Sequence, residues 1–99
     1  MIRVEISKNK ITVKGHANQA EYGNDIVCAS VSTAVIMSVN QIEVFNKAHC
    51  LDTKIFEGNT TITVVSEDEI VCKVLDNLIF TLKDLELQYP KYIKINEKL

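Results

Sequence analysis

His16 and Cys28 are the residues whose types and spacing could support nucleophilic catalysis. A cysteine attacks as its thiolate, and because a free thiol has a pKa of about 8.5, a catalytic cysteine needs a nearby cation or a helix dipole. We expect Cys28 in the first turn of a helix, where unpaired backbone N–H groups favour negative charge and could hold the oxyanion of an acyl intermediate. His16 lies twelve residues earlier, at the expected end of a strand, and the intervening loop can bring imidazole and thiol together. The pair therefore predicts acyl transfer, with Cys28 as nucleophile and His16 as its base.

Four residues around this pair have types that suit a supporting or binding role. Gly15 would allow a close backbone approach, and Gly23 would permit the unusual torsions of a sharp entry from loop to helix. Asp25 is either the helix N-cap, which would stabilise the helix by about 1 kcal/mol, or a group that orients the histidine. We expect residues 18–24 to form a loop that admits the substrate. Tyr22 is one of the few apolar residues in that loop, which favours a substrate contact over a cover for the core.

The spacing of His16 and Cys28 is also compatible with other kinds of site. Taken alone, it is more typical of a packing histidine and a buried thiol in a small domain. A zinc site would have to add His49 and Cys50, and the chain has no short paired-ligand motif, so we predict no metal. A redox-sensing thiol would need a resolving cysteine close to Cys28. A non-catalytic module and a redox-active thiol therefore remain as alternatives to an enzyme.

The other two cysteines serve as internal comparisons for Cys28. Cys72 also opens a predicted helix, but no histidine and no glycine loop precede it, so we expect it to be buried. Cys50 stands next to His49, but adjacent side chains on extended backbone point to opposite faces, so we expect that pair to be inert. An odd number of cysteines argues against a disulfide framework and for free thiols in a reducing compartment.

The hydrophobic pattern predicts an α+β fold with the order ββα-ββα-β. Alternating apolar and polar residues on both sides of a polar break indicate a first hairpin, and β-branched residues around Gly58 indicate a second. A helix follows each hairpin, and Pro90 stops the second one. We expect both helices to pack on a small, mostly antiparallel sheet. The predicted elements are strands at 2–6 and 11–13, a helix from 26 to about 47, strands at 51–56 and 60–66, a helix from 67–69 to about 87, and a strand at 92–95.

The first predicted helix is apolar on more than one face. The sheet would cover one face, and a second helix or a dimer partner would cover another. Its most apolar stretch, residues 26–39, contains three serines and a threonine and is shorter than the roughly 20 residues of a membrane span. We interpret it as a buried helix and predict no membrane association.

Composition and charge limit the classes of protein to be considered. The 99 residues, of which 46% are hydrophobic and 24% charged, predict one globular domain. The 11 basic and 13 acidic residues give a net charge of -2 without a long basic run, so we expect no direct binding to nucleic acid. The N-terminal residues alternate between polar and apolar and lack a signal-peptide pattern, which predicts a cytoplasmic protein.

The tripeptide Gly15-His16-Ala17 and the eleven residues from Tyr22 to Ser32, YGNDIVCASVS, resemble in residues and spacing the signature of the ribosomal-processing cysteine protease family of bacteria. The resemblance extends over the whole chain in length and in the order of elements. It implies a single peptidase domain over residues 1–99 that forms a homodimer and needs no metal or cofactor. It further implies removal of the N-terminal extension of a large-subunit ribosomal protein by cleavage after an aromatic residue.

The same resemblance implies roles for individual residues. It makes His16 and Cys28 the catalytic pair and places Asp25, Gly15 and Gly23 in support of them. The candidate substrate-binding residues are Tyr22, Ala29, Ser30 and Ser32. The main alternative is a non-catalytic, ribosome-associated binding module of the same fold.

Overall fold

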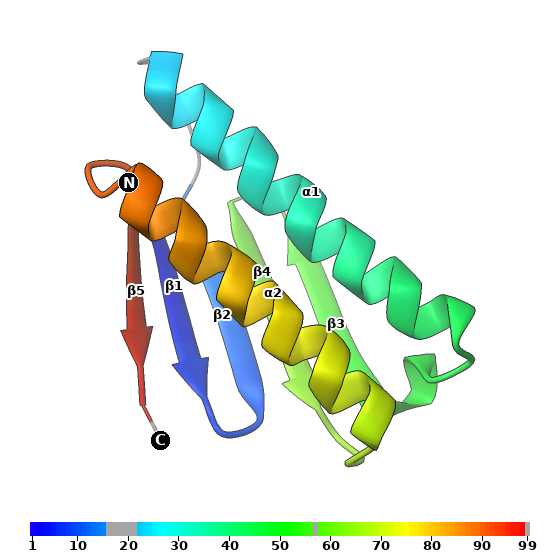
Figure 1. Cartoon of the computed structure of the whole chain (residues 1–99). Helices are drawn as coiled ribbons and strands as arrows, with labels where there is room; N and C mark the ends of the chain where they lie inside the picture. The colour runs from blue at the N-terminus through cyan, green and yellow to red at the C-terminus, as the bar shows by residue number, and fades with distance from the viewer. Residues whose placement is uncertain (16–21, 57, 99) are drawn as a thin grey trace.

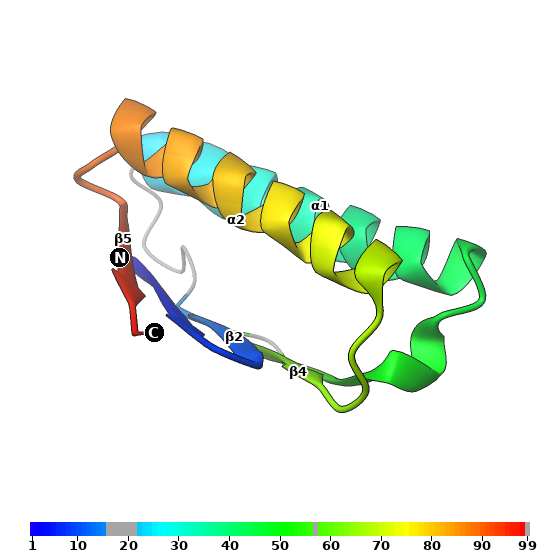
Figure 2. The same cartoon turned by 60° about the horizontal axis from the view of Figure 1, so that its bottom comes forward.

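Two helices lie side by side on one face of a five-stranded sheet, and neither of them covers the other face (Figures 1 and 2). The computed structural model describes residues 1–15, 22–56 and 58–98, with the backbone alone for residues 22–25. The predicted order ββα-ββα-β is confirmed. In chain order the elements are β1 (Ile2–Ser7), β2 (Lys10–Lys14), α1 (Tyr22–Val44), the short 3₁₀ helix η1 (Ala48–Cys50), β3 (Leu51–Phe56), β4 (Asn59–Val64), α2 (Glu69–Gln88) and β5 (Ile93–Glu97).

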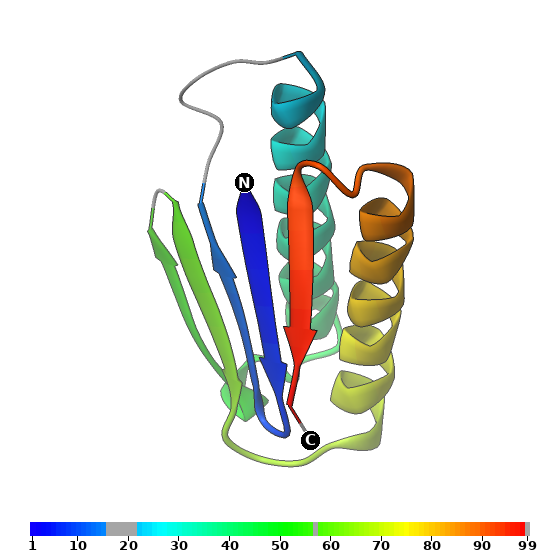
Figure 3. The same cartoon turned by 90° about the vertical axis from the view of Figure 1, so that its left-hand side faces the viewer.

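The sheet has the strand order β3-β4-β2-β1-β5. The pairs β3–β4, β4–β2 and β2–β1 are antiparallel, and β5 runs parallel to β1. The predicted α+β class with a mostly antiparallel sheet is therefore confirmed. Figure 3 shows the two layers from the side and places the end of β2 and the start of α1 at the same end of the molecule.

Helix α1 ends at Val44, before the predicted end near residue 47. Asn46 adopts a φ of 61°, and the N–H of Lys47 donates to the carbonyl oxygen of Ile42 at 3.0 Å. A left-handed residue followed by a hydrogen bond that reaches back five residues is the Schellman ending of a helix. Asparagine tolerates the left-handed conformation better than most residues, so Asn46 determines where α1 stops.

Helix α2 begins at an N-cap that also joins the two helices. The carboxylate of Asp68 accepts hydrogen bonds from the backbone N–H groups of Ile70, at 2.9 Å, and Val71, at 3.2 Å. It also pairs with the Nζ of Lys47 at 2.8 Å, which ties the segment after α1 to the start of α2. As predicted, α2 ends before Pro90.

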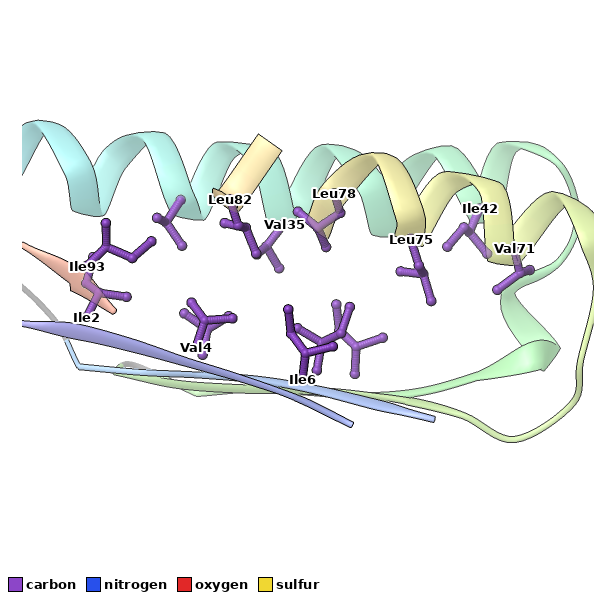
Figure 4. Packing of buried hydrophobic residues seen from close by; sticks show 14 of the residues in the cluster. Ile2, Val4, Ile6, Val35, Ile42, Val71, Leu75, Leu78, Leu82 and Ile93 are labelled. Carbon is purple, nitrogen blue, oxygen red and sulfur yellow. The ribbon is translucent and has the colours of Figure 1, made fainter. Parts of the chain in front are cut away.

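The hydrophobic core lies between the helices and the covered face of the sheet (Figure 4). On β1 buried residues alternate with exposed ones, as the period of a half-buried strand requires. On the helices the buried residues recur at intervals of three, four or seven, which is the stripe of an amphipathic helix. The buried residues of β1, α1 and α2 are Ile2, Val4 and Ile6; Val27, Val31, Val35 and Ile42; and Val71, Leu75, Leu78 and Leu82.

The outer face of α1 keeps large apolar side chains in solvent. Ile36, Met37 and Val44 are 49%, 67% and 78% exposed, and they line a shallow hollow with three polar neighbours from the same helix. Helix α2 supplies the predicted second cover for α1 on one flank only. The cover predicted for the remaining apolar surface is not provided by the described part of this chain.

Residues 26–44 of α1 are long and apolar enough to cross a membrane by length and composition, with a mean hydropathy of 1.4. This segment is longer than the stretch 26–39 on which the sequence prediction rested, so length alone does not exclude a membrane span. The core helix of a soluble protein passes the same test when it is mostly buried. Here 22% of the window is buried, Val27 and Val31 included, so the expectation of a buried helix holds for one face of α1 only.

Candidate active site

Cys28 lies on α1, half-buried, and packs at the margin of the hydrophobic core. Its neighbour Val27 is fully buried, while Ala29 is exposed, so the thiol stands between the core side and the solvent side of the helix. A side chain at such a margin is held by packing and still reaches the surface. This combination suits a nucleophile that must meet a substrate in a fixed orientation.

The prediction that Cys28 lies in the first turn of its helix is wrong. Helix α1 begins at Tyr22, so Cys28 is its seventh residue and lies in the second turn. The unpaired N–H groups of a helix are those of its first four residues, which here are residues 22–25. In this conformation the backbone N–H of Cys28 belongs to the regular helical pattern, and the unpaired amides lie about one turn before the thiol.

Three other expectations about the start of α1 change for the same reason. Residues 22–24 were expected in a loop, but their backbone is helical. Asp25 is therefore inside the first turn and is not the N-cap. Gly23 is a helical residue and does not form the sharp entry from loop to helix that was expected of it. The apolar run that identifies the helix starts at Ile26, and a more polar first turn in front of it has no hydrophobic period by which to recognise it.

Gly15 directly follows β2 and makes a close backbone approach, which the sequence predicts for it. Its φ is 102°, and a Cβ added to it would collide with the carbonyl oxygen of Met1. Its N–H donates to the carbonyl oxygen of Gly58 at 2.9 Å, so the end of β2 is held by β1 on one side and by the β3–β4 turn on the other. Sequence reasoning missed the part played by Gly58, although its turn between two β-branched runs was visible.

His16 follows this anchored glycine directly and itself lies outside the described residues, so the predicted pairing of its imidazole with Cys28 stays a prediction. The structure describes the residue before it, Gly15, and so the position at which the chain enters His16. That point is at the end of the sheet over which α1 begins (Figure 3).

The candidate substrate-binding residues differ in how free they are. Ala29 and Ser32 are exposed. The hydroxyl of Ser30 is half-buried and donates to the carbonyl oxygen of Ile26 at 2.8 Å, one turn back on the same helix. Tyr22 is the first residue of α1, and its side chain is outside the described part of the chain.

The other two cysteines occupy environments unlike those expected. Cys72 was predicted to be buried, but it is exposed. It lies in the first turn of α2, about 100° around the helix from Val71, and so stands beside the stripe of buried residues that reaches the core. Cys50 is buried at the end of the short helix η1, while His49 beside it is exposed. The two side chains are separated as expected, but by a 3₁₀ helix and not by the extended backbone from which the separation was inferred.

The titration shifts that the structure identifies lie away from this region. The pKa of Asp68 is lowered, first by its hydrogen bond with Lys47 and then by the backbone N–H of Val71, and the pKa of Lys47 is raised by the same partner. Both groups stand where α1 has ended and α2 begins, at the opposite end of the helices from Cys28. In the described ranges no group of three His, Cys, Asp or Glu side chains could hold a metal ion, and a set that includes His16 lies beyond those ranges.

Comparison with known proteins gives concordant results for sequence and structure. Residues 1–94 match the model of the family described as cysteine protease Prp. A ribosomal processing cysteine protease Prp from Mycoplasma genitalium is 32% identical over 98 residues, which is 99% of this chain and 97% of that protein. The corresponding protein from Staphylococcus aureus is 31% identical over 106 residues, covering 99% of this chain and all of its own length.

Solved structures of a ribosomal processing protease Prp from Staphylococcus aureus share the fold. The structure in complex with a substrate peptide superposes with a TM-score of 0.90 at 28% identity. The match covers 99% of this chain and all of that protein. The structure with a covalently linked product peptide gives a TM-score of 0.86 at 29% identity with the same coverage.

Proposed function

The chain belongs to the cysteine protease Prp family, and from this premise we propose that Cys28 is the nucleophile of its peptide-bond hydrolysis and His16 the general base. The observation that carries the assignment is the shared location of the two segments. Gly15 holds the end of β2, from which His16 departs, at the end of the molecule where α1 presents Cys28. The half-buried thiol at the core margin supports a nucleophile in a fixed orientation.

The reaction follows from these roles. The imidazole of His16 takes the thiol proton, and the Sγ of Cys28 attacks the scissile carbonyl carbon to form a tetrahedral intermediate. The C–N bond then breaks, the leaving amine takes the proton from the imidazole, and a thioester joins the acyl part to Cys28. Water, deprotonated by His16, hydrolyses that thioester and restores the free thiol. A relative that was solved with a covalently linked product peptide supports a covalent route.

The oxyanion of both tetrahedral steps needs donors that α1 offers in its first turn. Because the unpaired amides of residues 22–25 lie before Cys28, we propose that the first turn of α1 rearranges when substrate binds, so that these amides approach the developing charge. Gly23 makes such a rearrangement less costly, since glycine stabilises a helix least of all residues except proline. Asp25 lies in the same turn and would orient His16 or the rearranged backbone.

We propose that the substrate is the N-terminal extension of a large-subunit ribosomal protein, cut after an aromatic residue. The support is the ribosomal processing activity named for relatives that cover nearly the whole of this chain. Ala29 and Ser32, which are exposed on the same helix as the thiol, would contact the peptide, and Tyr22 and Ser30 complete the proposed binding set. Residues 1–99 act as one peptidase domain, and the reaction needs no metal or cofactor.

We further propose that the protein works in the cytoplasm as a homodimer. Ribosomal processing supports the location. The exposed apolar residues on the outer face of α1 support the oligomeric state, because a second copy of the chain would cover the surface that α2 leaves open.

The test is cleavage of the ribosomal protein, with its extension, from the organism that encodes the chain. Wild type should remove the extension, and Cys28→Ala should lower kcat/KM by at least about a thousandfold with folding intact. Cys72→Ala is the matched control and should cleave like wild type. If Cys72→Ala were inactive and folded while Cys28→Ala cleaved, the nucleophile would be wrong. Intact substrate with folded wild type would favour the non-catalytic ribosome-associated module.

A further inference from the structure

The open face of the sheet carries more than half of the basic residues of this acidic chain. Residues directly opposite each other on neighbouring strands point to the same face, so the register identifies the outward side chains. Arg3 on β1 is opposite Lys14 on β2 and Lys94 on β5, and the side chains next to it along β1 are buried on the covered face. The six cations on this face are Arg3, Lys10, Lys14, Lys54, Lys94 and Lys98.

The charge of this face is opposite to that of the rest of the protein. Among the described residues of the sheet, two acids, Glu5 and Asp52, share the face with these six cations, which gives these residues a formal charge of +4. The other five basic and eleven acidic residues of the chain give −6, since the total is −2. The helices α1 and α2 account for six of these acids and two of these lysines, a formal charge of −4.

The arrangement of the cations is not explained by folding. Three cations lie directly opposite one another on neighbouring strands, with Arg3 between Lys14 and Lys94. Like charges in such positions destabilise a sheet. Within the described residues none of the six cations is in an ion pair, because the pairs there involve Lys47, Lys73 and Lys83. A hollow of about 230 Å³ lies among Lys10, Lys14 and Lys98. These cations are thus free to bind an external anion.

We propose that the open face of the sheet binds the phosphate backbone of RNA without reading its sequence. Residues two apart on a strand are about 6–7 Å apart and neighbouring strands about 4.8 Å, so the cations spread over a surface and do not converge on one small anion. This spread suits a chain of phosphates, because proteins bind a phosphate backbone mainly with Lys and Arg side chains. An anionic membrane would favour large apolar side chains among the cations. Among the residues of this face that the structure describes, Phe56 at its edge is the only large apolar side chain. The choice of RNA rests on the proposed function, because the substrate proposed there is a protein of the ribosome, and the ribosome contains RNA.

The test is binding of a fluorescently labelled RNA hairpin, measured by anisotropy as a function of salt. Wild type should bind at about 50 mM salt with an affinity that falls steeply as salt rises. Lys10→Gln/Lys94→Gln should weaken binding roughly tenfold and reduce the slope of log K against log salt by about 1.5. The matched control Lys73→Gln/Lys91→Gln removes the same charge from exposed residues outside this face and should bind like wild type.

Three results would overturn the proposal: no binding of RNA by wild type at low salt, equal weakening by both double variants, or tighter binding of polyglutamate or of phosphatidylglycerol vesicles than of RNA. Cleavage of a short peptide substrate without RNA separates this inference from the proposed function. Both double variants should cleave the peptide like wild type. Loss of RNA binding with intact cleavage leaves the protease assignment untouched, and RNA binding without any cleavage overturns only the protease assignment.

Discussion

Gly15 is the residue whose geometry leaves least room for substitution. Its φ of 102° is a conformation that residues with a Cβ rarely adopt, and the space where a Cβ would stand is taken by the carbonyl of Met1. The same residue donates to Gly58 and precedes His16. A change at this position would therefore affect both the stability of the protein and the position at which the chain enters His16, the proposed base.

Gly15→Ala should lower the free energy of unfolding by about 1–3 kcal/mol, because backbone strain and a steric collision add. It should also lower kcat/KM, since moving the end of β2 displaces the residue that follows. Urea unfolding and peptide cleavage measure the two effects. The control is Gly58→Ala, which sits at a φ of 74° and should lose stability with a smaller loss of cleavage. Wild-type stability of Gly15→Ala would contradict the geometry.

The three cysteines should respond differently to truncation because their burial differs. Cys72 is exposed, so Cys72→Ala should change the free energy of unfolding by no more than about 0.5 kcal/mol. Cys50 is 2% exposed within the core, so Cys50→Ala should cost about 1–2 kcal/mol through the cavity that it leaves. Chemical denaturation of the two variants beside wild type measures both. An equal decrease in the free energy of unfolding in the two variants would contradict the different burial of these two thiols.

At the scale of elements, the junction of α1 with α2 depends on one carboxylate. Asp68 caps α2 and pairs with Lys47, which follows the Schellman ending of α1. The pKa of Asp68 is lowered mainly by the hydrogen bond with Lys47, and the pKa of Lys47 is raised mainly by the same bond. The stabilisation from Asp68 is thus present above its unfolded pKa and is lost as pH falls through the depressed folded value. The stabilisation from Lys47 is present below its unfolded pKa and is lost as pH rises through the raised folded value.

Asp68→Asn should keep the cap and lose the ion pair, because asparagine is also a good N-cap. Near neutral pH its Tm should lie about 3 °C below that of wild type, and the difference should vanish in acid below the depressed pKa of Asp68. Thermal melts from about pH 2, where a carboxylate with a lowered pKa becomes protonated, to about pH 9, where it is fully ionised, measure this. Glu69→Gln is the control, because its pair with Lys73 is highly exposed, and it should melt like wild type. A Tm difference that persists unchanged in acid would exclude the ion pair as its cause.

At the scale of the whole molecule, two surfaces remain without a partner in the described chain. The outer face of α1 is apolar and the open face of the sheet is basic, and they lie on opposite sides of the two layers. The first would be covered by a second copy of the chain and the second by RNA. Since the two surfaces do not overlap, the proposed dimer could bind RNA.

Met37→Glu should convert the proposed dimer to a monomer, because it would bury a charge in the centre of the interface. Sedimentation velocity over a range of concentrations measures the oligomeric state. Phe80→Glu is the matched control, because Phe80 is 71% exposed on α2, and this variant should stay dimeric. A wild type that is monomeric throughout, or a dimeric Met37→Glu variant, would exclude this face as the dimer interface.

Local patterns in the sequence were sufficient for the elements and their order. Period-two and helical spacing, the turn at Gly58 and the stop at Pro90 act within a few residues, so they can be recognised without tertiary information. The same local chemistry identified the His16 and Cys28 segments and the need for glycine at position 15. It failed at the start of α1, where a polar first turn carries no hydrophobic period.

Only the tertiary structure decided what these elements present to one another. The pairing of β4 with β2 and of β5 with β1 joins strands far apart in the chain, and no local rule specifies it. That pairing gathers dispersed cations into one surface, although the sequence contains no basic run and predicted no contact with nucleic acid. Packing likewise buried Cys50 and exposed Cys72, against expectation for the latter. Burial and surface charge depend on which strands and helices become neighbours, and long-range packing, not the neighbouring residues in the chain, determines that.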